Sequence, residues 1–153
     1  MKVLLQVVKE ASVTIDDKLY SKINKGFLLF VGFTQTDNEE IMHKVIDKVL
    51  SLRLFPDENG KTNLGINDVE GQVMCISQFT LYADVKKGRR PSFTSAAGSS
   101  ISLPLYQKTI EYINSLGYDC KTGVFGADMK VSLINDGPFT IIVEDKDLAW
   151  VKE

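Results

Sequence analysis

The most constraining feature of this sequence is the run Phe27-Leu28-Leu29-Phe30-Val31-Gly32-Phe33, in which no polar side chain interrupts the apolar ones. A strand with one solvated face alternates apolar and polar residues, so an unbroken apolar run indicates a strand buried on both faces. Such a strand needs a partner layer on either side. We therefore expect a layered domain built around residues 27–33, and a chain of 153 residues is long enough for one such core.

Strand patterns also occur before and after this run. They cover residues 3–8, 11–15, 18–23, 72–81, 129–134 and 139–143. Asp16-Asp17 is typical of a turn between two of these strands. The segment 72–81 begins with a continuous apolar stretch, so we expect it to be a second buried strand.

Two segments show helical periodicity. The first ends near Leu52, and Asp37 is expected to cap its start together with Glu40 three residues on. The second is expected to start near Leu103-Pro104 and to stop at Gly117. Runs of strands with two separated helices predict an α+β domain with a mixed or largely antiparallel sheet, rather than alternating βαβ units.

The composition is ordinary for a globular chain, with 44% hydrophobic and 25% charged residues, and no apolar run is long enough to cross a membrane. No repeat or linker divides the sequence, so residues 1–153 are expected to form one domain with 144–153 as a solvated tail. Cys75 and Cys120 do not make a disulfide framework, and the expected location is therefore the reducing cytoplasm.

Few residues are available for metal or imidazole chemistry. His43 is the only histidine, and it falls on the polar face of the first predicted helix. There is no CxxC, HExxH, GxGxxG or complete P-loop pattern, so we expect neither a metal site nor a cofactor. A hydrolytic reaction in this protein would have to proceed without a protein imidazole.

Positive charge gathers in one loop of a chain whose net charge is −2. Lys86, Lys87, Arg89 and Arg90 lie close together, and no acidic residue occurs between Val85 and Ile110. This pattern suits a short phosphate-bearing ligand segment better than a long duplex.

Two polar motifs interrupt apolar strands. Ser77-Gln78-Phe79-Thr80-Leu81 is compatible with a strand whose polar residues alternate outward, or with a strand end that offers backbone N–H groups, hydroxyls and an amide to a ligand. Donors of the second kind stabilise a developing oxyanion, and losing one costs ~3–4 kcal/mol. Asn135-Asp136-Gly137-Pro138-Phe139-Thr140 is typical of a hairpin turn. Its X-Pro bond could instead be cis, which would point two carbonyl oxygens the same way.

Together with the basic loop between them, these motifs make the chain resemble the bacterial D-aminoacyl-tRNA deacylase family. Agreement extends through Glu10–Val13, Gln78–Phe93 and Gly126–Met129. The resemblance implies a barrel-like sheet with two main helices and a homodimer that hydrolyses the ester between a D-amino acid and the terminal adenosine of tRNA. Glycyl-tRNA, including that mischarged on tRNA-Ala, is expected to be a substrate as well.

The resemblance also assigns roles to residues. Its implied catalytic residues are Ser77, Gln78, Phe79 and Thr80. The backbone amides of Phe79 and Thr80 would face the substrate. Gly137-Pro138, as a Gly-cisPro dipeptide, would enter the partner's pocket and reject L-amino acids. Phe125 and Met129 match positions near that pocket. The implied tRNA-binding residues are Lys86, Lys87, Arg89 and Arg90.

Two alternatives stay open at this point. The family is thought to use the ribose 2′-OH of the substrate rather than a protein nucleophile such as Thr80, and nothing in the sequence looks able to activate a threonine hydroxyl. A second class of function is a tRNA acceptor-end binding module without catalysis. Phe139 stands where the family commonly has valine, which leaves the preferred amino-acid side chain undetermined.

Overall fold

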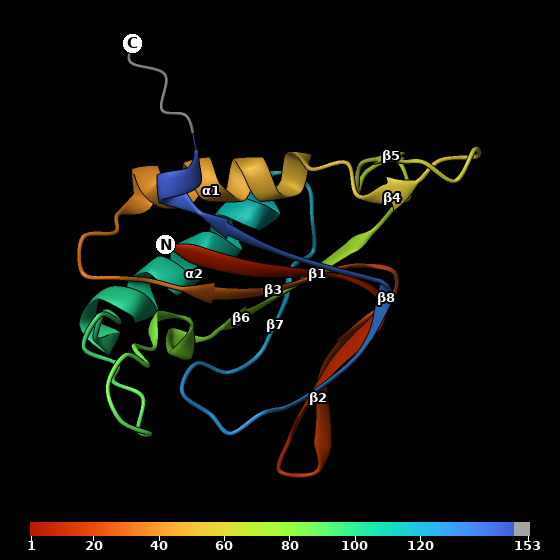
Figure 1. The fold of residues 1–153 in the computed structure, drawn as a ribbon. Helices are drawn as coiled ribbons and strands as arrows, with labels where there is room; N and C mark the ends of the chain where they lie inside the picture. The colour runs from red at the N-terminus through yellow and green to blue at the C-terminus, as the bar shows by residue number, and fades with distance from the viewer. Residues whose placement is uncertain (149–153) are drawn as a thin grey trace.

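The computed structural model of the protein describes residues 1–148. Its main sheet has the strand order β2-β1-β3-β6-β7, and β8 pairs with β1 (Figure 1). The strands of this sheet are β1 (Lys2–Ile15), β2 (Lys18–Ile23), β3 (Gly26–Gly32), β6 (Gln72–Ser77), β7 (Lys121–Thr122) and β8 (Lys130–Glu144). The strands β4 (Phe55–Pro56) and β5 (Thr62–Leu64) form a separate hairpin. The helices of the described chain are α1 (Glu39–Ser51), α2 (Ser99–Ser115) and the short 3₁₀ helices η1 (Phe79–Tyr82) and η2 (Asp145–Asp147).

The main sheet is mixed and curls toward closure. β1 pairs antiparallel with β2, β3 and β8, whereas the β3–β6 and β6–β7 pairs are parallel. The two ends of the strand order approach each other, because the Ser21 hydroxyl on β2 donates to the Thr122 carbonyl on β7 at 2.6 Å. The expected α+β class, with a mixed barrel-like sheet and two main helices, is confirmed.

β3 is the central strand that its apolar run predicts. It lies between β1 and β6, and its side chains divide the core into two clusters. Phe27, Leu29 and Val31 pack in the larger cluster, together with the apolar faces of α1 and α2. Leu28 and the half-buried Phe30 pack on the opposite face, in the smaller cluster inside the curl of the sheet. Burial on both faces explains why no polar residue interrupts this strand.

β1 is one long strand where the sequence pattern indicates two. Val3, Leu5 and Val7 belong to the larger cluster, whereas Val8, Ala11 and Val13 belong to the smaller one. Val8 still follows the alternation of the earlier residues, so the phase changes between Val8 and Ala11, where the pairing of β1 with β8 also shifts register. A bulge of this kind lets one strand serve two cores without ending.

β8 corrects a second expectation. Residues 135–138 do not form a hairpin turn, because the segments on both sides of them pair with the same strand, β1. Gln6 pairs with Thr140 and Val8 with Asn135, so residues 136–139 lie opposite Val7 alone. The motif is a wide bulge in a continuous strand rather than the link between two strands.

The helix boundaries differ from the sequence expectation at their starts. The N-cap of α1 is Asn38, whose side chain accepts the N–H of Ile41 at 2.9 Å. Asp37 instead accepts the N–H of Thr34 at 2.7 Å and pairs with the amino group of Met1 at 2.9 Å. α1 ends at Ser51 with Leu52 as its C-cap, as expected.

α2 begins at Ser99, several residues before the predicted start, and Pro104 lies inside it. Its first turn is closed by the N–H groups of Ile101 and Ser102, which both donate to the Gly98 carbonyl. The helix ends at Ser115, and Gly117 follows with φ +100° as the predicted stop. No helix in residues 1–148 is long and apolar enough to cross a membrane.

The end of β8 and the segment after it are held by ion pairs as far as they are described. The carboxylate of Glu144 lies 3.6 Å from Lys2, and that of Asp145 lies 2.8 Å from the amino group of Met1. The remainder of the predicted solvated tail, residues 149–153, lies outside the described residues.

Candidate active site

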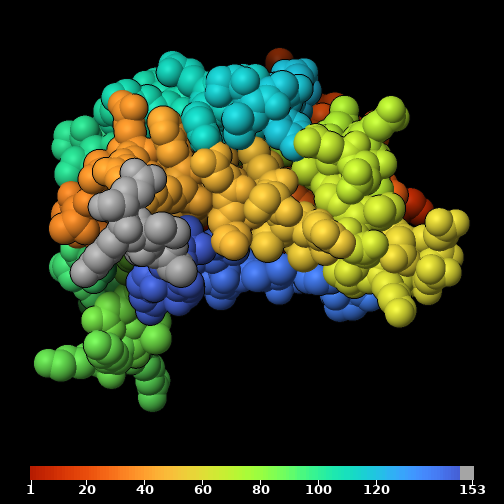
Figure 2. Space-filling view, turned by 90° about the horizontal axis from the view of Figure 1, so that it is seen from above, coloured from red at the N-terminus to blue at the C-terminus, as the bar shows by residue number. Residues whose placement is uncertain are grey.

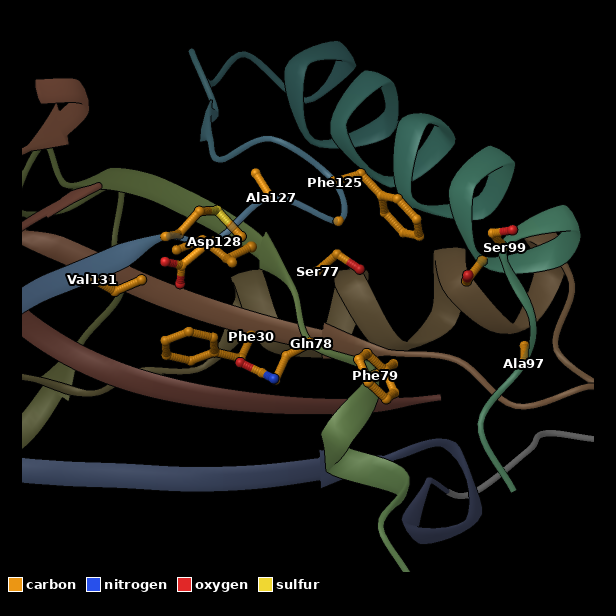
Figure 3. Close-up of a pocket in the computed structure, with 14 residues that line it drawn as sticks. Phe30, Ser77, Gln78, Phe79, Ala97, Ser99, Phe125, Ala127, Asp128 and Val131 are labelled. Carbon is orange, nitrogen blue, oxygen red and sulfur yellow. The ribbon is translucent and has the colours of Figure 1, made fainter. Parts of the chain in front are cut away.

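A cavity of about 480 Å³ opens where β6 ends (Figure 3). Its walls come from four parts of the chain: Phe30 of β3, the end of β6 with the start of η1, the start of α2, and the segment that leads into β8. The lining residues used below are Phe30, Ser77, Gln78, Phe79, Ser102, Phe125, Asp128 and Met129. Five of the predicted site residues, Ser77, Gln78, Phe79, Phe125 and Met129, therefore come together in one cavity.

The first wall is formed where β6 leaves the sheet. The parallel ladder with β3 ends at the pair Val31–Ser77, and the N–H of Gln78 makes one last bond to the Val31 carbonyl at 2.8 Å. The predicted strand thus stops at Ser77 instead of Leu81. Figure 3 shows Ser77 directed toward the Phe125 ring and Gln78 directed toward Phe30. The motif is a strand end, and the alternative of an outward-alternating strand is wrong.

η1 turns the next residues away from the sheet. In the described chain no carbonyl accepts the N–H of Phe79 or of Thr80, as is usual for the first N–H groups of a helical turn. The N–H of Leu81 returns to the Gln78 carbonyl at 3.3 Å and that of Ala83 to the Thr80 carbonyl at 3.0 Å. Two backbone donors are thus left for a ligand at the edge of the cavity, where Phe79 is 53% exposed.

Thr80 does not line the cavity itself. Its hydroxyl accepts a short hydrogen bond from the side-chain amide of Gln78. An amide nitrogen donates protons and does not take them up, so this contact orients the hydroxyl without activating it as a nucleophile. His43 does not line the cavity either. Its ring stacks on that of Tyr112 on the α1–α2 surface, with the ring centroids 4.0 Å apart.

The opposite wall rests on a buried tyrosine that the sequence reading missed. The Tyr106 hydroxyl donates to the Cys75 carbonyl at 2.7 Å and thereby ties α2 to β6. Its ring lies 6.1 Å from that of Phe125, centroid to centroid. Burial raises the pKa of the Tyr106 phenol, so the hydroxyl stays protonated and remains a donor. In the sequence, the one indication of this role is a tyrosine on the apolar face of the second predicted helix. That pattern is equally typical of a simple core residue.

Met129 and Cys75 have contrasting environments. Met129 lines the cavity and packs so closely on Gly123 that a Cβ at that glycine would lie 2.2 Å from its sulfur. Cys75 is fully buried, and the hydrogen bond with the Cys120 thiol and then burial raise its pKa well above the usual value. A protonated core thiol is not a nucleophile. Within residues 1–148 no group of His, Cys, Asp and Glu is arranged to hold a metal ion.

The start of α2 contributes polar residues that were not predicted either. Ser102 is buried and donates to the Gly98 carbonyl at 3.0 Å. The sequence reading placed the start of this helix at Pro104, and for that reason it did not connect residues 99–102 with the site. Asp128 likewise lines the cavity, and its carboxylate lies 3.2 Å from Lys130.

Gly137 and Pro138 lie on the exposed bulge of β8 and do not line this cavity. The peptide bond between them is cis, and Gly137 has φ +147°. Asn135 spans the bulge: its side chain accepts the N–H of Phe139 at 2.8 Å and donates to the Thr140 hydroxyl at 2.7 Å. The dipeptide is therefore presented outward by a hydrogen-bonded frame.

The four basic residues also lie outside the cavity, on the loop between η1 and α2. This loop projects from the body of the protein (Figures 1 and 2), and Lys86, Lys87, Arg89 and Arg90 are exposed. Two backbone hydrogen bonds between Asp84 and Ser92, at 2.7 and 2.8 Å, close the base of the loop.

Taken by themselves, the fold and cavity define an α+β domain with one aromatic pocket edged by hydroxyls, amides and free backbone donors, a setting suited to a small organic group. Comparison with known proteins is more specific. A family model described as D-Tyr-tRNA(Tyr) deacylase matches residues 4–144. A D-aminoacyl-tRNA deacylase of Flavobacterium psychrophilum is 49% identical over 148 residues, covering 96% of this chain and 99% of the relative. Another from an Exiguobacterium species is 51% identical, covering 94% and 98%.

Solved structures agree on the fold. A protein described as c-Myc DNA unwinding element binding protein is 35% identical, with a TM-score of 0.88 over 94% of this chain and 98% of that one. A probable eukaryotic D-amino acid tRNA deacylase is only 16% identical, yet it has a TM-score of 0.82 over 93% of this chain and 97% of its own. The chain belongs to the D-aminoacyl-tRNA deacylase family, as its two motifs predicted.

Proposed function

We propose that this protein hydrolyses the ester of D-aminoacyl-tRNA, and of glycyl-tRNA mischarged on tRNA-Ala, while it leaves L-aminoacyl-tRNA intact. One observation carries the proposal: the chain matches the deacylase family over residues 4–144, and its Ser77-Gln78-Phe79 motif lines the main cavity. Aminoacylated tRNA is then the partner, and the cytoplasm is the site of action.

The cavity suits the end of the substrate. Its volume of about 480 Å³ lies within the roughly 300–1,000 Å³ of ordinary small-ligand pockets. The ring of Phe125 offers a flat apolar surface for the terminal adenine, and Met129 fills irregular space in the same cavity. Ser77 and Gln78 supply the polar contacts that fix the orientation of the ester.

The backbone donors at the start of η1 supply the electrostatic part of catalysis. Hydrolysis of an ester builds negative charge on the former carbonyl oxygen, and N–H groups that are already oriented stabilise that charge without reorganisation. The N–H groups of Phe79 and Thr80 fit this role, because no carbonyl of the described chain occupies them. Losing one such donor costs about 3–4 kcal/mol in comparable sites.

The activation of water is assigned to the substrate. Within residues 1–148 the hydroxyl of Thr80 has only the Gln78 amide as its partner, and His43 lies on the α1–α2 surface. The ribose 2′-OH of the terminal adenosine is adjacent to the ester and holds the attacking water by a hydrogen bond. The water oxygen bonds to the carbonyl carbon, the bond from that carbon to O3′ breaks, and O3′ takes up the proton released by the water, which gives the free amino acid and the 3′-OH of the tRNA. Positioning of this kind converts a bimolecular step into one within the bound complex.

Selection against L-amino acids is assigned to the Gly-cisPro motif of a second subunit. Gly137 and Pro138 are exposed and do not line the cavity of their own chain, so they are free to enter that of a partner. The carbonyls would hold the α-ammonium, and the side chain of an L-amino acid would collide with the main chain. Exposed apolar side chains on the sheet support a homodimer: Leu19, Tyr20, Ile134 and Ile142.

The decisive experiment compares D-tyrosyl-tRNA, L-tyrosyl-tRNA and glycyl-tRNA-Ala at low enzyme concentration. The expected result is loss of the D-ester and the glycyl ester with the L-ester intact. Loss of both tyrosyl esters would remove the selectivity part of the proposal. Persistence of all three, with retained binding of tRNA, would show a non-catalytic acceptor-end binding module.

A second experiment tests the role of the 2′-OH. D-tyrosyl-tRNA that ends in 2′-deoxyadenosine should resist hydrolysis by the wild-type protein. Full hydrolysis of the deoxy substrate would assign the activation of water to another group. Sedimentation at the enzyme concentrations of the assay tests the homodimer.

A further inference from the structure

A second concave surface lies beside the active-site cavity and has no role so far. It is a groove of about 440 Å³ at the base of the basic loop. Its main lining residues are Lys2, Thr34, Tyr82, Asp84, Lys86 and Ser95. The two concavities share their dividing wall: η1 runs from Phe79 in the cavity to Tyr82 in the groove. At the rise of a 3₁₀ helix this separation is only about 6 Å along the chain.

The wall between them carries an exposed aromatic pair. The rings of Phe79 and Phe93 meet edge to face, with centroids 5.1 Å apart. Phe79 is 53% exposed and Phe93 is 37% exposed. Exposed aromatic rings of this kind serve as stacking surfaces for the bases of single-stranded nucleic acid, whatever the base sequence.

The far side of the groove is rigid. The Thr34 hydroxyl donates to the Ser95 carbonyl at 2.7 Å, and the Gln35 amide donates to the carbonyls of Thr94 and Ala96 at 2.8 and 3.1 Å. These bonds hold the segment next to Phe93 against the end of β3. The groove is thus preformed and needs little ordering to receive a ligand.

The charges around the groove favour an anionic ligand. Lys86, Lys87, Arg89 and Arg90 make no ion pair with any described residue. The carboxylate of Asp84 accepts the N–H of Lys86 at 2.9 Å, so it is engaged with the loop backbone.

Each of the other carboxylates near Tyr82 is in contact with a cation. Those of Asp37 and Asp145 pair with the amino group of Met1. That of Glu144 lies 3.6 Å from Lys2 and 3.0 Å from Lys146. The Lys2 ammonium itself lies 4.7 Å from the centre of the Tyr82 ring.

We propose that this groove and the Phe79–Phe93 pair bind the unpaired nucleotides that precede the terminal adenosine, with their bases on the aromatic rings and their phosphates on the basic loop. This inference rests on the proposed function, since it takes the cavity as the seat of the aminoacylated adenosine. It adds a recognition site for single-stranded RNA, in which Phe93 is a substrate-binding residue outside the two family motifs.

The test compares a long and a minimal substrate of the same ester: D-tyrosyl-tRNA and the D-tyrosyl ester of adenosine. In Phe93→Leu, the ratio of kcat/KM for the tRNA to that for the adenosine ester should fall about tenfold, as expected when one stacked base loses its aromatic surface. Phe93→Tyr should restore the ratio. Lys86→Ala should lower it and also reduce the salt dependence of the tRNA reaction by about 0.7 in log-log slope per lost phosphate contact.

Lys61→Ala is the matched charge control, because this exposed lysine lies in the β4–β5 connection away from the groove. Its ratio should equal that of the wild type. Equal ratios in Phe93→Leu, Lys86→Ala and the wild type would overturn the inference while leaving the deacylase activity in place. A wild-type protein that hydrolyses neither substrate would instead remove the proposed function, and the inference with it.

A second measurement does not depend on the adenosine ester. The trinucleotide CCA should inhibit hydrolysis of D-tyrosyl-tRNA more strongly than adenosine does, and Phe93→Leu should abolish the difference. A blunt RNA hairpin that inhibits as strongly as CCA would show duplex binding by the basic loop and would overturn the assignment to single-stranded nucleotides.

Discussion

The end of β6 and the middle of β8 share a sequence feature, but the structure differs at the two places. In both, polar residues interrupt an apolar strand: Ser77-Gln78 in one and Asn135-Asp136 in the other. β6 stops there, because its ladder partner β3 ends at Gly32 and offers no further hydrogen bonds. β8 continues, because β1 extends past the bulge as far as Lys2 and the chain can pair again with it there.

The length of the neighbouring strand therefore decides what a polar interruption becomes. At a strand end, backbone donors are released toward a cavity, as at Phe79 and Thr80. In a bulge, the backbone is pushed outward while both flanks stay paired, as at Gly137 and Pro138. The first arrangement suits a pocket wall, and the second suits a rigid projection that reaches another surface.

The largest effect is expected from a substitution that distorts the bulge of β8. At Gly137 a Cβ would lie 2.9 Å from the backbone nitrogen of Phe139, and φ is +147°. Gly137→Ala should lower the free energy of unfolding by about 1–3 kcal/mol and, by displacing Pro138, reduce kcat/KM on D-tyrosyl-tRNA about 100-fold. Urea unfolding and single-turnover hydrolysis measure the two effects.

Gly60→Ala is the control for this change. Gly60 also has a positive φ, +76°, but no atom lies within 4 Å of its would-be Cβ. It should lose stability without losing activity. Wild-type kinetics and wild-type discrimination between D- and L-esters in Gly137→Ala would contradict the role of the bulge.

A smaller effect should come from the frame of the bulge. Asn135→Ala removes the bonds to the Phe139 N–H and the Thr140 hydroxyl, and at roughly 1 kcal/mol for each bond the unfolding free energy should fall by about 2 kcal/mol. Discrimination between D- and L-esters should weaken more than the stability loss alone explains. Asn135→Asp keeps an acceptor for both partners and should restore most of the discrimination. Equal behaviour of the two variants would argue against positioning by this side chain.

Tyr106→Phe tests the hydrogen bond that ties α2 to β6 behind the cavity wall. It removes the bond between α2 and the Cys75 carbonyl and should lower the unfolding free energy by about 1 kcal/mol. KM for D-tyrosyl-tRNA should rise slightly, because α2 is no longer tied to β6 beside the cavity, while selectivity against the L-ester stays intact. A loss of selectivity here would mean that pocket and bulge are not separate devices.

The smallest effect is expected at Thr80. Thr80→Ala keeps the backbone N–H and removes a hydroxyl whose one described partner is the Gln78 amide. Hydrolysis of the D-ester should fall by less than about fivefold, since a contact of this kind is worth about 0.5–1 kcal/mol. A loss of several hundredfold would identify Thr80 as the nucleophile.

Sequence reasoning found the central strand because burial on both faces leaves an unmistakable pattern in residues 27–33. It wrongly predicted a hairpin turn at residues 135–138, since the same residue types occur where a chain reverses and where it only bends. It missed Ser102, because it started the second helix near Leu103-Pro104, and Tyr106, because a tyrosine on an apolar helix face is equally typical of a core residue. The first motif predicted residues that line the cavity, but the partner strands that shape both motifs are set by pairing over long distances in the chain.

The pairing of β1 with β8 has a consequence for the synthesis of the protein. β1 leaves the ribosome before the other strands of this domain, and all of those are made before its long partner β8 emerges. Until then one edge of β1 is open, and such edges invite pairing with other chains. The bulge with Gly137 and Pro138 also forms only when this last pairing closes. A nascent chain therefore acquires its exposed Gly137-Pro138 bulge and its protection from aggregation in the same late event.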